Sequence, residues 1–434
     1  MKNYGDLKIK DHCLTVGGCK ASALAEKYGT PIYVFDVNRA VKTAKAYVDV
    51  LEKEYGNFTV CYASKAFCCT GIYNVLAPLG LGADVVSGGE LYTALKGGID
   101  PKRIYFHGNN KSESEIKYAL TVGVGCFVVD SIDEADIISK HARAPQRVIV
   151  RVNPGVEAHT HRFIQTTMPD SKFGFSVADG TAKQFILSIK DKPNIDFAGV
   201  ACHIGSQIFE KQSFEIAIDK MTDFIAELEK LGVKVKILDL GGGFGIRYID
   251  EDNPLTPEQY MANSARYLKA AAEQKGITLP HLVVEPGRSI VGEAGITLYT
   301  VGSIKTIKDL KTYAAVDGGM FENPRPSMYD AEYTAVVADR ADAENTNTYS
   351  IAGKCCESGD VLIKDIKLPK LSRGDVLAVL STGAYHYSMA SNYNRNAVPP
   401  VVAVKDGKSD YMIKPQTYED LVRNDVIPFS ENNK

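Results

Sequence analysis

Eight short runs of apolar, β-forming residues recur between residues 59 and 284, and a longer stretch that suits a helix separates each from the next. Parallel strands need such long crossover connections, so this alternation predicts a parallel sheet covered by helices. Eight repeats are the number that closes a (β/α)8 TIM barrel, an α/β fold. The runs are Thr59–Ala63, Ala83–Val86, Arg103–Phe106, Cys126–Val129, Val148–Val152, Phe197–Cys202, Val235–Leu240 and Leu282–Val284.

The clearest helical segment of the barrel region runs from Ser213 to Leu231. Its apolar residues recur every three or four positions and so form one face. These residues are Phe214, Ile218, Met221, Ile225 and Leu228. A second segment with helical spacing, from Asn38 to about Tyr55, precedes the first strand.

After about Gly292 the pattern changes to short β-rich pieces separated by Gly, Pro, Asn and Asp. This predicts a mostly antiparallel β domain, which the N-terminal strand joins. We expect a barrel over residues 30–288 and a β-rich domain made of residues 1–29 and 289–434. The pieces are Thr297–Ile304, Thr312–Val316, Tyr333–Ala338, Asn347–Ala352, Val376–Leu380 and Val401–Val404.

The net charge of the 434 residues is −3, which gives no reason to expect a nucleic-acid or membrane partner. The nine cysteines lack any C-x-x-C spacing, so we expect reduced thiols. No apolar run follows the start of the chain, and none approaches the about 18 residues of a membrane span. These features predict a soluble, cytoplasmic protein.

Polar side chains follow nearly every predicted strand. In a (β/α)8 barrel the active site lies at the carboxyl ends of the strands, so such occupancy indicates chemistry rather than stability alone. In strand order the residues are Lys65, Ser87, His107, Asp130, Arg151 with Asn153, His203 with Ser206, Gly241–Gly243, and Glu285 to Arg288.

Lys65 follows the first strand and has the small neighbours Ser64 and Ala66. An amine held partly out of solvent there would have a lowered pKa and could form a Schiff base. The alternative is a solvated lysine at a strand end, which is the commoner role of this residue type.

Gly241, Gly242 and Gly243 follow the seventh strand, where side-chain-free backbone can close on a phosphate. The alternative is a glycine-rich tight turn. Arg288, next to Gly287, offers a guanidinium for the same anion. Together these residues favour a phosphate site.

Glu285 follows the eighth strand and has two interpretations. It forms a structural ion pair, or it holds a pyridine nitrogen protonated and so makes the ring an electron sink. His203 is either a core histidine or a flat ring that stacks on a flat cofactor. His159 and His161 alternate without carboxylate partners, so we expect no metal site.

Several motifs resemble those of the fold-type III pyridoxal-phosphate decarboxylases, which combine an alanine racemase-like barrel with a β domain. The resemblance runs from Tyr33 to Pro400 and is greatest to the branch of the ornithine/lysine/arginine class-II family that acts on diaminopimelate. The motifs are Tyr62-Ala63-Ser64-Lys65-Ala66, Ala83-Asp84-Val85-Val86-Ser87-Gly88-Gly89-Glu90, His203-Ile204-Gly205-Ser206-Gln207, Glu285-Pro286-Gly287-Arg288, Cys356-Glu357-Ser358-Gly359-Asp360 and Gly383-Ala384-Tyr385.

This resemblance implies that the cofactor is pyridoxal 5'-phosphate. It implies that Lys65 carries the cofactor, that His203 stacks on its ring and that Glu285 meets the ring nitrogen. It assigns the phosphate to a larger set, namely Ser206, Gly241, Gly242, Gly243, Pro286, Gly287, Arg288 and Tyr385.

The same resemblance implies that the chain converts meso-2,6-diaminopimelate to L-lysine and CO2 in lysine biosynthesis. Guanidinium groups suit the distal carboxylate of this substrate, and a glutamate suits its ammonium. The substrate-binding residues would be Arg288, Arg325, Tyr329, Glu357 and Tyr385.

Two alternatives remain for the activity. One is decarboxylation of another diamino acid, namely carboxynorspermidine, ornithine or arginine; ornithine-type enzymes usually show Cys-Asp where this chain has Cys356-Glu357. The other is a non-catalytic binding homologue, against which the presence of Lys65 and Cys356 argues.

Cys356 is, by this resemblance, the acid that protonates the α-carbon, and it comes from a partner subunit. A homodimer with shared active sites is therefore the expected assembly. Cys355 competes weakly for the acid role, but the run from Glu357 to Asp360 fixes the register in favour of Cys356.

Overall fold

The computed structural model describes residues 4–156 and 171–429, which form two compact units. Residues 39–293 make one unit, and residues 1–38 with 294–434 make the other. His159 and His161, for which we expected no metal role, lie outside the described residues.

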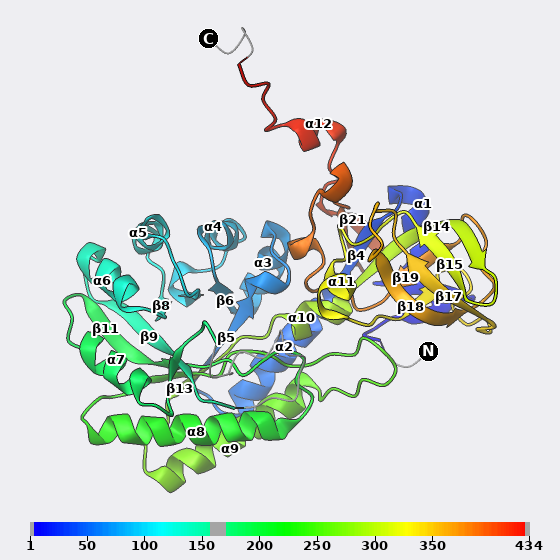
Figure 1. Ribbon diagram of the computed structural model, residues 1–434. Helices are drawn as coiled ribbons and strands as arrows, with labels where there is room; N and C mark the ends of the chain where they lie inside the picture. Colours follow the sequence, from blue (N-terminus) through cyan, green and yellow to red (C-terminus); the bar gives the residue numbers. More distant parts are fainter. Residues whose placement is uncertain (1–3, 157–170, 430–434) are drawn as a thin grey trace. The chain divides into compact units, whose positions relative to one another are not determined.

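The first unit is a closed barrel of eight parallel strands, which confirms the predicted fold (Figure 1). Each barrel strand pairs in parallel with the next barrel strand along the chain. The last strand, β13, pairs with the first, β5, and this pairing closes the ring. The strands are β5 (Phe58–Ala63), β6 (Gly82–Val85), β7 (Ile104–Phe106), β8 (Cys126–Val129), β9 (Gln146–Asn153), β11 (Ile195–Ala201), β12 (Ile237–Asp239) and β13 (His281–Val284). A further short strand, β10 (Phe175–Ser176), extends the sheet beside β9.

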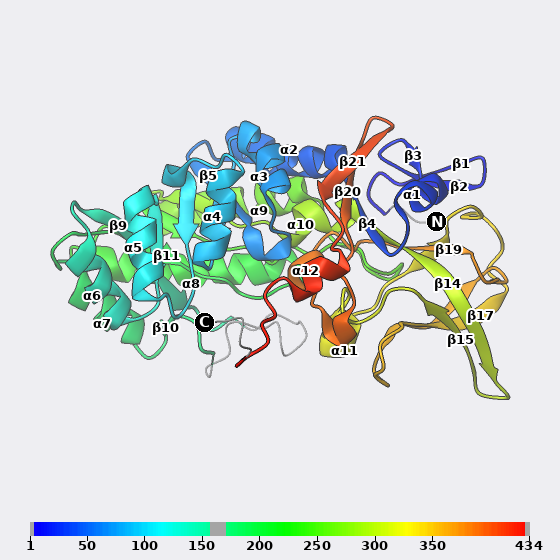
Figure 2. The ribbon, with the colours of Figure 1, turned by 90° about the horizontal axis from the view of Figure 1, so that it is seen from above.

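A helix follows each barrel strand, as the alternation predicts. Figure 2, the view from above, shows α5, α6 and α7 grouped together, and Figure 1 shows α8 and α9 side by side. The helices are α3 (Thr70–Leu76), α4 (Gly88–Lys96), α5 (Glu113–Val122), α6 (Ile132–His141), α7 (Thr181–Ile189), α8 (Lys211–Lys230), α9 (Pro257–Lys275) and α10 (Arg288–Val291), with α2 (Val37–Glu54) before β5.

Local sequence explains where these helices begin and which face they bury. Ser87, Ser112, Ser131 and Thr256 each cap a helix by accepting the backbone N–H three residues later. The predicted apolar face of α8 is buried along its whole length. The helices are therefore held by packing against the strands rather than by propensity alone.

Buried side chains from seven barrel strands form one hydrophobic cluster. They are Cys61, Tyr105, Cys126, Val128, Ile149, Ala198, Ala201, Ile237 and Val283. A packed interior leaves the strand ends as the place where polar side chains can converge.

The second unit is a mostly antiparallel sheet, as predicted, with two parallel pairings, β15–β17 and β20–β4. A smaller sheet of β1 (Lys8–Lys10), β2 (Cys13–Val16) and β3 (Cys19–Lys20) precedes α1 (Ala21–Tyr28). The main sheet contains β4 (Ile32–Asp36), β14 (Gly295–Ile307), β15 (Lys311–Val316), β16 (Ala335–Val337), β17 (Asn347–Ala352), β18 (Val361–Leu368), β19 (Val376–Val379), β20 (Val401–Lys405) and β21 (Lys408–Ile413).

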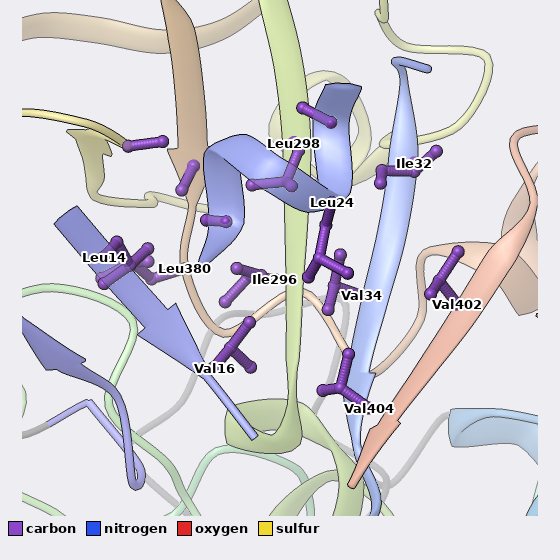
Figure 3. Packing of buried hydrophobic residues seen from close by; sticks show 14 of the residues in the cluster. Leu14, Val16, Leu24, Ile32, Val34, Ile296, Leu298, Leu380, Val402 and Val404 are labelled. Carbon is purple, nitrogen blue, oxygen red and sulfur yellow. The ribbon is translucent and has the colours of Figure 1, made fainter. Parts of the chain in front are cut away.

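The strand β4 belongs to this second unit, whereas our expected boundary assigned residues from 30 onward to the barrel. It pairs antiparallel with β14 and parallel with β20. Figure 3 shows Val34 of β4 among apolar side chains from both ends of the chain. An apolar strand carries no mark of which sheet it will join, so the spacing of the sequence did not reveal this assignment.

Among the described residues no helix has the length and apolar character needed to cross a bilayer. All nine cysteines lie in the described ranges, and each is a free thiol.

Candidate active site

Lys65 lies in a 3₁₀ turn, Ser64–Ala66, directly after β5. Of the two interpretations, a partly desolvated amine and a solvated lysine at a strand end, the structure favours the second: Lys65 is exposed, while its neighbours Ser64 and Ala66 are buried. Lys65 therefore stands at the carboxyl end of β5, the end of the barrel where active sites of this fold lie.

Glu285, after β13, forms a close ion pair with His107, after β7. Glu285 Oε1 and His107 Nε2 are 2.5 Å apart, and both residues are 6% exposed. The two atoms meet without an aligned hydrogen bond. The structure thus places Glu285 in an ion pair and also leaves its buried oxygen without an aligned donor.

Two carboxylates that the sequence reading did not select, Asp84 and Asp239, surround this pair. His107 Nε2 lies 3.8 Å from Asp239 Oδ2 and 4.0 Å from Asp84 Oδ1, and the two aspartates are 0% and 4% exposed. Each is a single carboxylate inside an apolar strand, β12 or β6. A single carboxylate inside an apolar strand could have indicated a site residue, because a buried carboxylate needs a specific partner.

The pKa values of these carboxylates are shifted in opposite directions. Burial raises the pKa of Glu285, but the charge of His107 and its contact bring the value down to about 2. Burial and the charge of Glu285 raise the pKa of Asp239 well above its usual range. Burial likewise raises the pKa of Asp84. Glu285 is accordingly the one of these three carboxylates whose pKa is lowered.

Asp84, His107 and Glu285 also present one potential metal-ligand atom each, within 4.8 Å of one another. However, the 2.5 Å contact between His107 and Glu285 is too short for two ligands of one cation, which sit about 2.0–2.2 Å from the metal on different sides. We interpret the group as an ion-pair cluster.

Gly241, Gly242 and Gly243 pack against neighbouring strand ends more closely than any side chain permits. A Cβ at Gly242 would lie 2.2 Å from the carbonyl oxygen of Glu285, and one at Gly243 would lie 2.4 Å from that of Gly205. Gly243 also has a φ of +97°, which favours glycine. These close approaches explain why the turn consists of glycines. The contact of the turn with a phosphate stays a prediction.

His203 is an uncharged ring next to this loop. The N–H of Gly242 donates to its Nδ1 over 3.2 Å, so the ring carries its proton on Nε2. Burial and the charges of Lys65 and Arg151 hold the pKa of His203 well below its ordinary value. A flat, neutral imidazole suits stacking on an aromatic ring.

Arg288 and Ser206, both predicted at a phosphate, are in contact. Arg288 Nη2 donates to Ser206 Oγ over 2.7 Å, and Nη1 donates to the Tyr248 hydroxyl over 2.5 Å. Arg288 is 6% exposed. Its guanidinium is thus fixed by two hydroxyl groups of the same unit.

The turn from Pro286 to Gly287 lies directly against the end of β5. The Ala63 N–H donates to the Pro286 carbonyl over 3.2 Å, and a Cβ at Gly287 would be 2.9 Å from the Ala63 Cβ. The eighth strand end is thereby held next to the strand that precedes Lys65.

In the second unit, Arg325 is close to Tyr385, as predicted for a shared site. Arg325 begins α11 (Arg325–Tyr329) and is 9% exposed. It donates to the Tyr333 hydroxyl, and its guanidinium carbon is 6.0 Å from the centre of the Tyr385 ring. Tyr333 is a neighbour that sequence reasoning did not select.

Cys356 and Glu357 are both exposed in the second unit. The Cys356 N–H donates to Asn394 Oδ1 over 2.9 Å. Cys355 is half-buried; burial and the carboxylate of Asp360 raise the pKa of its thiol to about 11. The two thiols therefore differ in environment, and Cys356 is the more accessible.

A family model described as the pyridoxal-binding domain of pyridoxal-dependent decarboxylases matches residues 39–292. The diaminopimelate decarboxylase of Bacillus subtilis is 46% identical over 97% of each chain, and that of Halalkalibacterium halodurans is 46% identical over 95% of each. A solved structure of the diaminopimelate decarboxylase of M. jannaschii superposes with a TM-score of 0.92 at 36% identity, covering 98% of this chain and 99% of that one.

The residues of the barrel mouth fit the cofactor of this family, pyridoxal 5'-phosphate. Lys65 is exposed at a strand end, and the buried Glu285 Oε1 has no aligned donor among the described residues. His203 adds a flat neutral ring. From this site and these similarities, the chain belongs to the pyridoxal-dependent decarboxylases and, within them, to the diaminopimelate decarboxylase family.

Proposed function

We propose that this chain removes CO2 from meso-2,6-diaminopimelate and releases L-lysine, with pyridoxal 5'-phosphate as cofactor. The observation that carries this proposal is the convergence of Lys65, His203 and Glu285 at one end of the barrel, in a chain whose relatives match over nearly their whole length.

Each of these three residues has one task in the proposed reaction. Lys65 anchors the cofactor through its amine, His203 lies against the ring, and Glu285 holds a proton at the ring nitrogen. When bound, the cofactor supplies an electron sink for the pair that CO2 leaves behind. The ionised state of Glu285 supports this role, because a carboxylate at the ring nitrogen favours the protonated ring.

We assign the cofactor phosphate to the backbone of Gly241–Gly243, to Ser206, and to the turn of Pro286, Gly287 and Arg288, together with Tyr385. The hydrogen bond between Ser206 and Arg288 supports part of this set. In this assignment residues 39–293 are the cofactor-binding domain, and the other unit completes the active site.

We assign the two ends of the substrate to Arg288, Arg325, Tyr329, Glu357 and Tyr385. A guanidinium binds a carboxylate through two parallel hydrogen bonds, and the glutamate pairs with the distal ammonium. The contact of Arg325 with Tyr333 and its position near Tyr385 support a pre-oriented guanidinium.

Cys356 is the proposed acid, which delivers a proton from its Sγ to the α-carbon. Its exposure supports a role toward a group outside its own unit. We further propose that it acts in the site of a second subunit, so that the active form is a homodimer. Free cysteines throughout the described chain support a cytoplasmic location.

Exposed apolar side chains near the C-terminus support assembly with another copy. In and after α12 (Tyr418–Val422), Tyr418, Val422, Val426 and Phe429 are 82%, 54%, 76% and 102% exposed. Large exposed apolar side chains that gather in one segment mark interaction sites.

Lysine release from meso-diaminopimelate by the wild type and by Lys65→Ala tests the function. We expect activity in the first and near-complete loss in the second. Lys230→Ala, an exposed lysine at the end of α8, is the matched control and should retain activity. Faster turnover of ornithine, arginine or carboxynorspermidine than of diaminopimelate would contradict the substrate assignment.

A further inference from the structure

His107 is in direct contact with Glu285. Its Nε2 lies 2.5 Å from Glu285 Oε1 but 3.8 Å and 4.0 Å from the nearest oxygens of Asp239 and Asp84. All four side chains are at least nine-tenths buried. They come from four different strand ends, so only the closed barrel brings them together.

Three carboxylates in such a small buried volume need a counter-charge, because an isolated buried carboxylate is strongly disfavoured. Asp84 Oδ1, Asp239 Oδ2 and Glu285 Oε1 have no aligned hydrogen-bond partner in the described part of the chain. Among these side chains, the His107 imidazole is the one that offers Glu285 a cationic partner, at 2.5 Å.

We propose that His107 is a positioning residue for the cofactor: its contact with Glu285 keeps that carboxylate ionised and oriented toward the ring nitrogen. The inference rests on the proposed function, since it takes Glu285 as the ring-nitrogen contact. The pKa shifts agree with it, because the pKa of Glu285 is lowered to about 2 while that of Asp239 is raised.

Other groups also face Glu285 and must be counted in any pH dependence. Arg151 adds a second, weaker positive influence, and burial keeps the thiols of Cys61 and Cys202 neutral. The full set is Cys61 on β5, Asp84 on β6, His107 after β7, Arg151 on β9, Cys202 and His203 after β11, and Asp239 on β12. The charge of Lys65 in addition lowers the pKa values of Asp84 and His203.

The test measures how tightly the full-length protein holds pyridoxal phosphate, independently of turnover. Equilibrium dialysis of wild type and His107→Gln at pH 6 and pH 8 gives the dissociation constants. We expect about 10- to 100-fold weaker binding in the variant, the loss typical of one charge-assisted contact. The ratio of variant to wild type should grow as the pH falls, because Glu285 without its cation takes up a proton.

Removal of a competing carboxylate should rescue the variant. Asp239→Asn added to His107→Gln lowers the need for a cation, so we expect the double variant to regain about tenfold in affinity. His141→Gln, another histidine paired with a glutamate in the barrel unit, is the control and should bind as the wild type does. If only the double variant folds, the charge role is supported; if neither folds, it is overturned.

Glu285→Gln separates this inference from the proposed function. If Glu285→Gln binds the cofactor as tightly as the wild type, the assignment of Glu285 to the ring nitrogen fails. If Glu285→Gln weakens binding and His107→Gln does not, the inference about His107 alone is overturned. The inference is also overturned if His107→Gln loses the same factor in cofactor affinity at both pH values and Asp239→Asn does not restore it. His107 would then act only through packing.

Discussion

The Lys111 ammonium lies 2.6 Å from Glu134 Oε1, in an ion pair whose side chains are 1% and 3% exposed. Lys111 also donates to the carbonyls of Gly108 and Val128 over 2.9 and 2.8 Å. Glu134 Oε2 accepts the N–H of Asp130 over 3.1 Å. The pair therefore ties the loop after β7 to the end of β8 and to α6.

Replacement of Lys111 by Met leaves the Glu134 charge buried without its partner. We expect the free energy of unfolding to fall by about 3–5 kcal/mol, the usual cost of removing one side of a buried pair. Lys111→Met with Glu134→Leu should cost clearly less, since no charge is left. Denaturant unfolding followed by circular dichroism measures both, and a double variant less stable than the single one would contradict the ion-pair explanation.

Gly242→Ala should disrupt the barrel mouth, because its Cβ would lie 2.2 Å from the carbonyl oxygen of Glu285. We expect a loss of about 1–3 kcal/mol in stability and weaker cofactor retention. The control is Gly89→Ala in α4, where the nearest atom to a new Cβ is 3.7 Å away. It should be neutral or slightly stabilising. Melting temperature and cofactor absorbance after dialysis report both effects.

Cys356→Ser should reduce lysine release by about 100-fold or more, the usual contribution of a positioned acid. Cys355→Ser, its direct neighbour, should retain nearly full activity, because its half-buried thiol lies against Asp360 and its pKa is raised to about 11. Turnover measured with equal cofactor content decides between them. The reverse result would transfer the acid role to Cys355.

We expect Glu322 to make the second unit less stable as the pH rises. Burial raises its pKa to about 8 in the folded chain, despite the hydrogen bond from Tyr299. The folded state thus binds a proton that the unfolded state releases above a pKa of about 4.3, so stability falls between about pH 5 and pH 8 and levels off above. Melting temperatures from pH 5 to pH 8 should fall less steeply for Glu322→Gln than for the wild type; parallel curves would contradict this.

The barrel could be predicted because its strands are buried on both faces and so appear as apolar runs of regular spacing. The same reasoning missed β18 and β21, which are the two edges of the second sheet. Edge strands carry polar and charged residues, and β21 reads Lys-Ser-Asp-Tyr-Met-Ile. Their apolar signal is therefore diluted.

The sequence alone determined that Lys65, His203, Glu285 and the glycine loop stand at strand ends, because the alternation of strands and helices fixes which residues follow each strand. Only the tertiary structure decided that Asp84 and Asp239 crowd the pair of His107 and Glu285. Closure of the barrel brings side chains from distant strands within contact distance. The pKa of a buried charged group depends on these neighbours, which no local sequence pattern specifies.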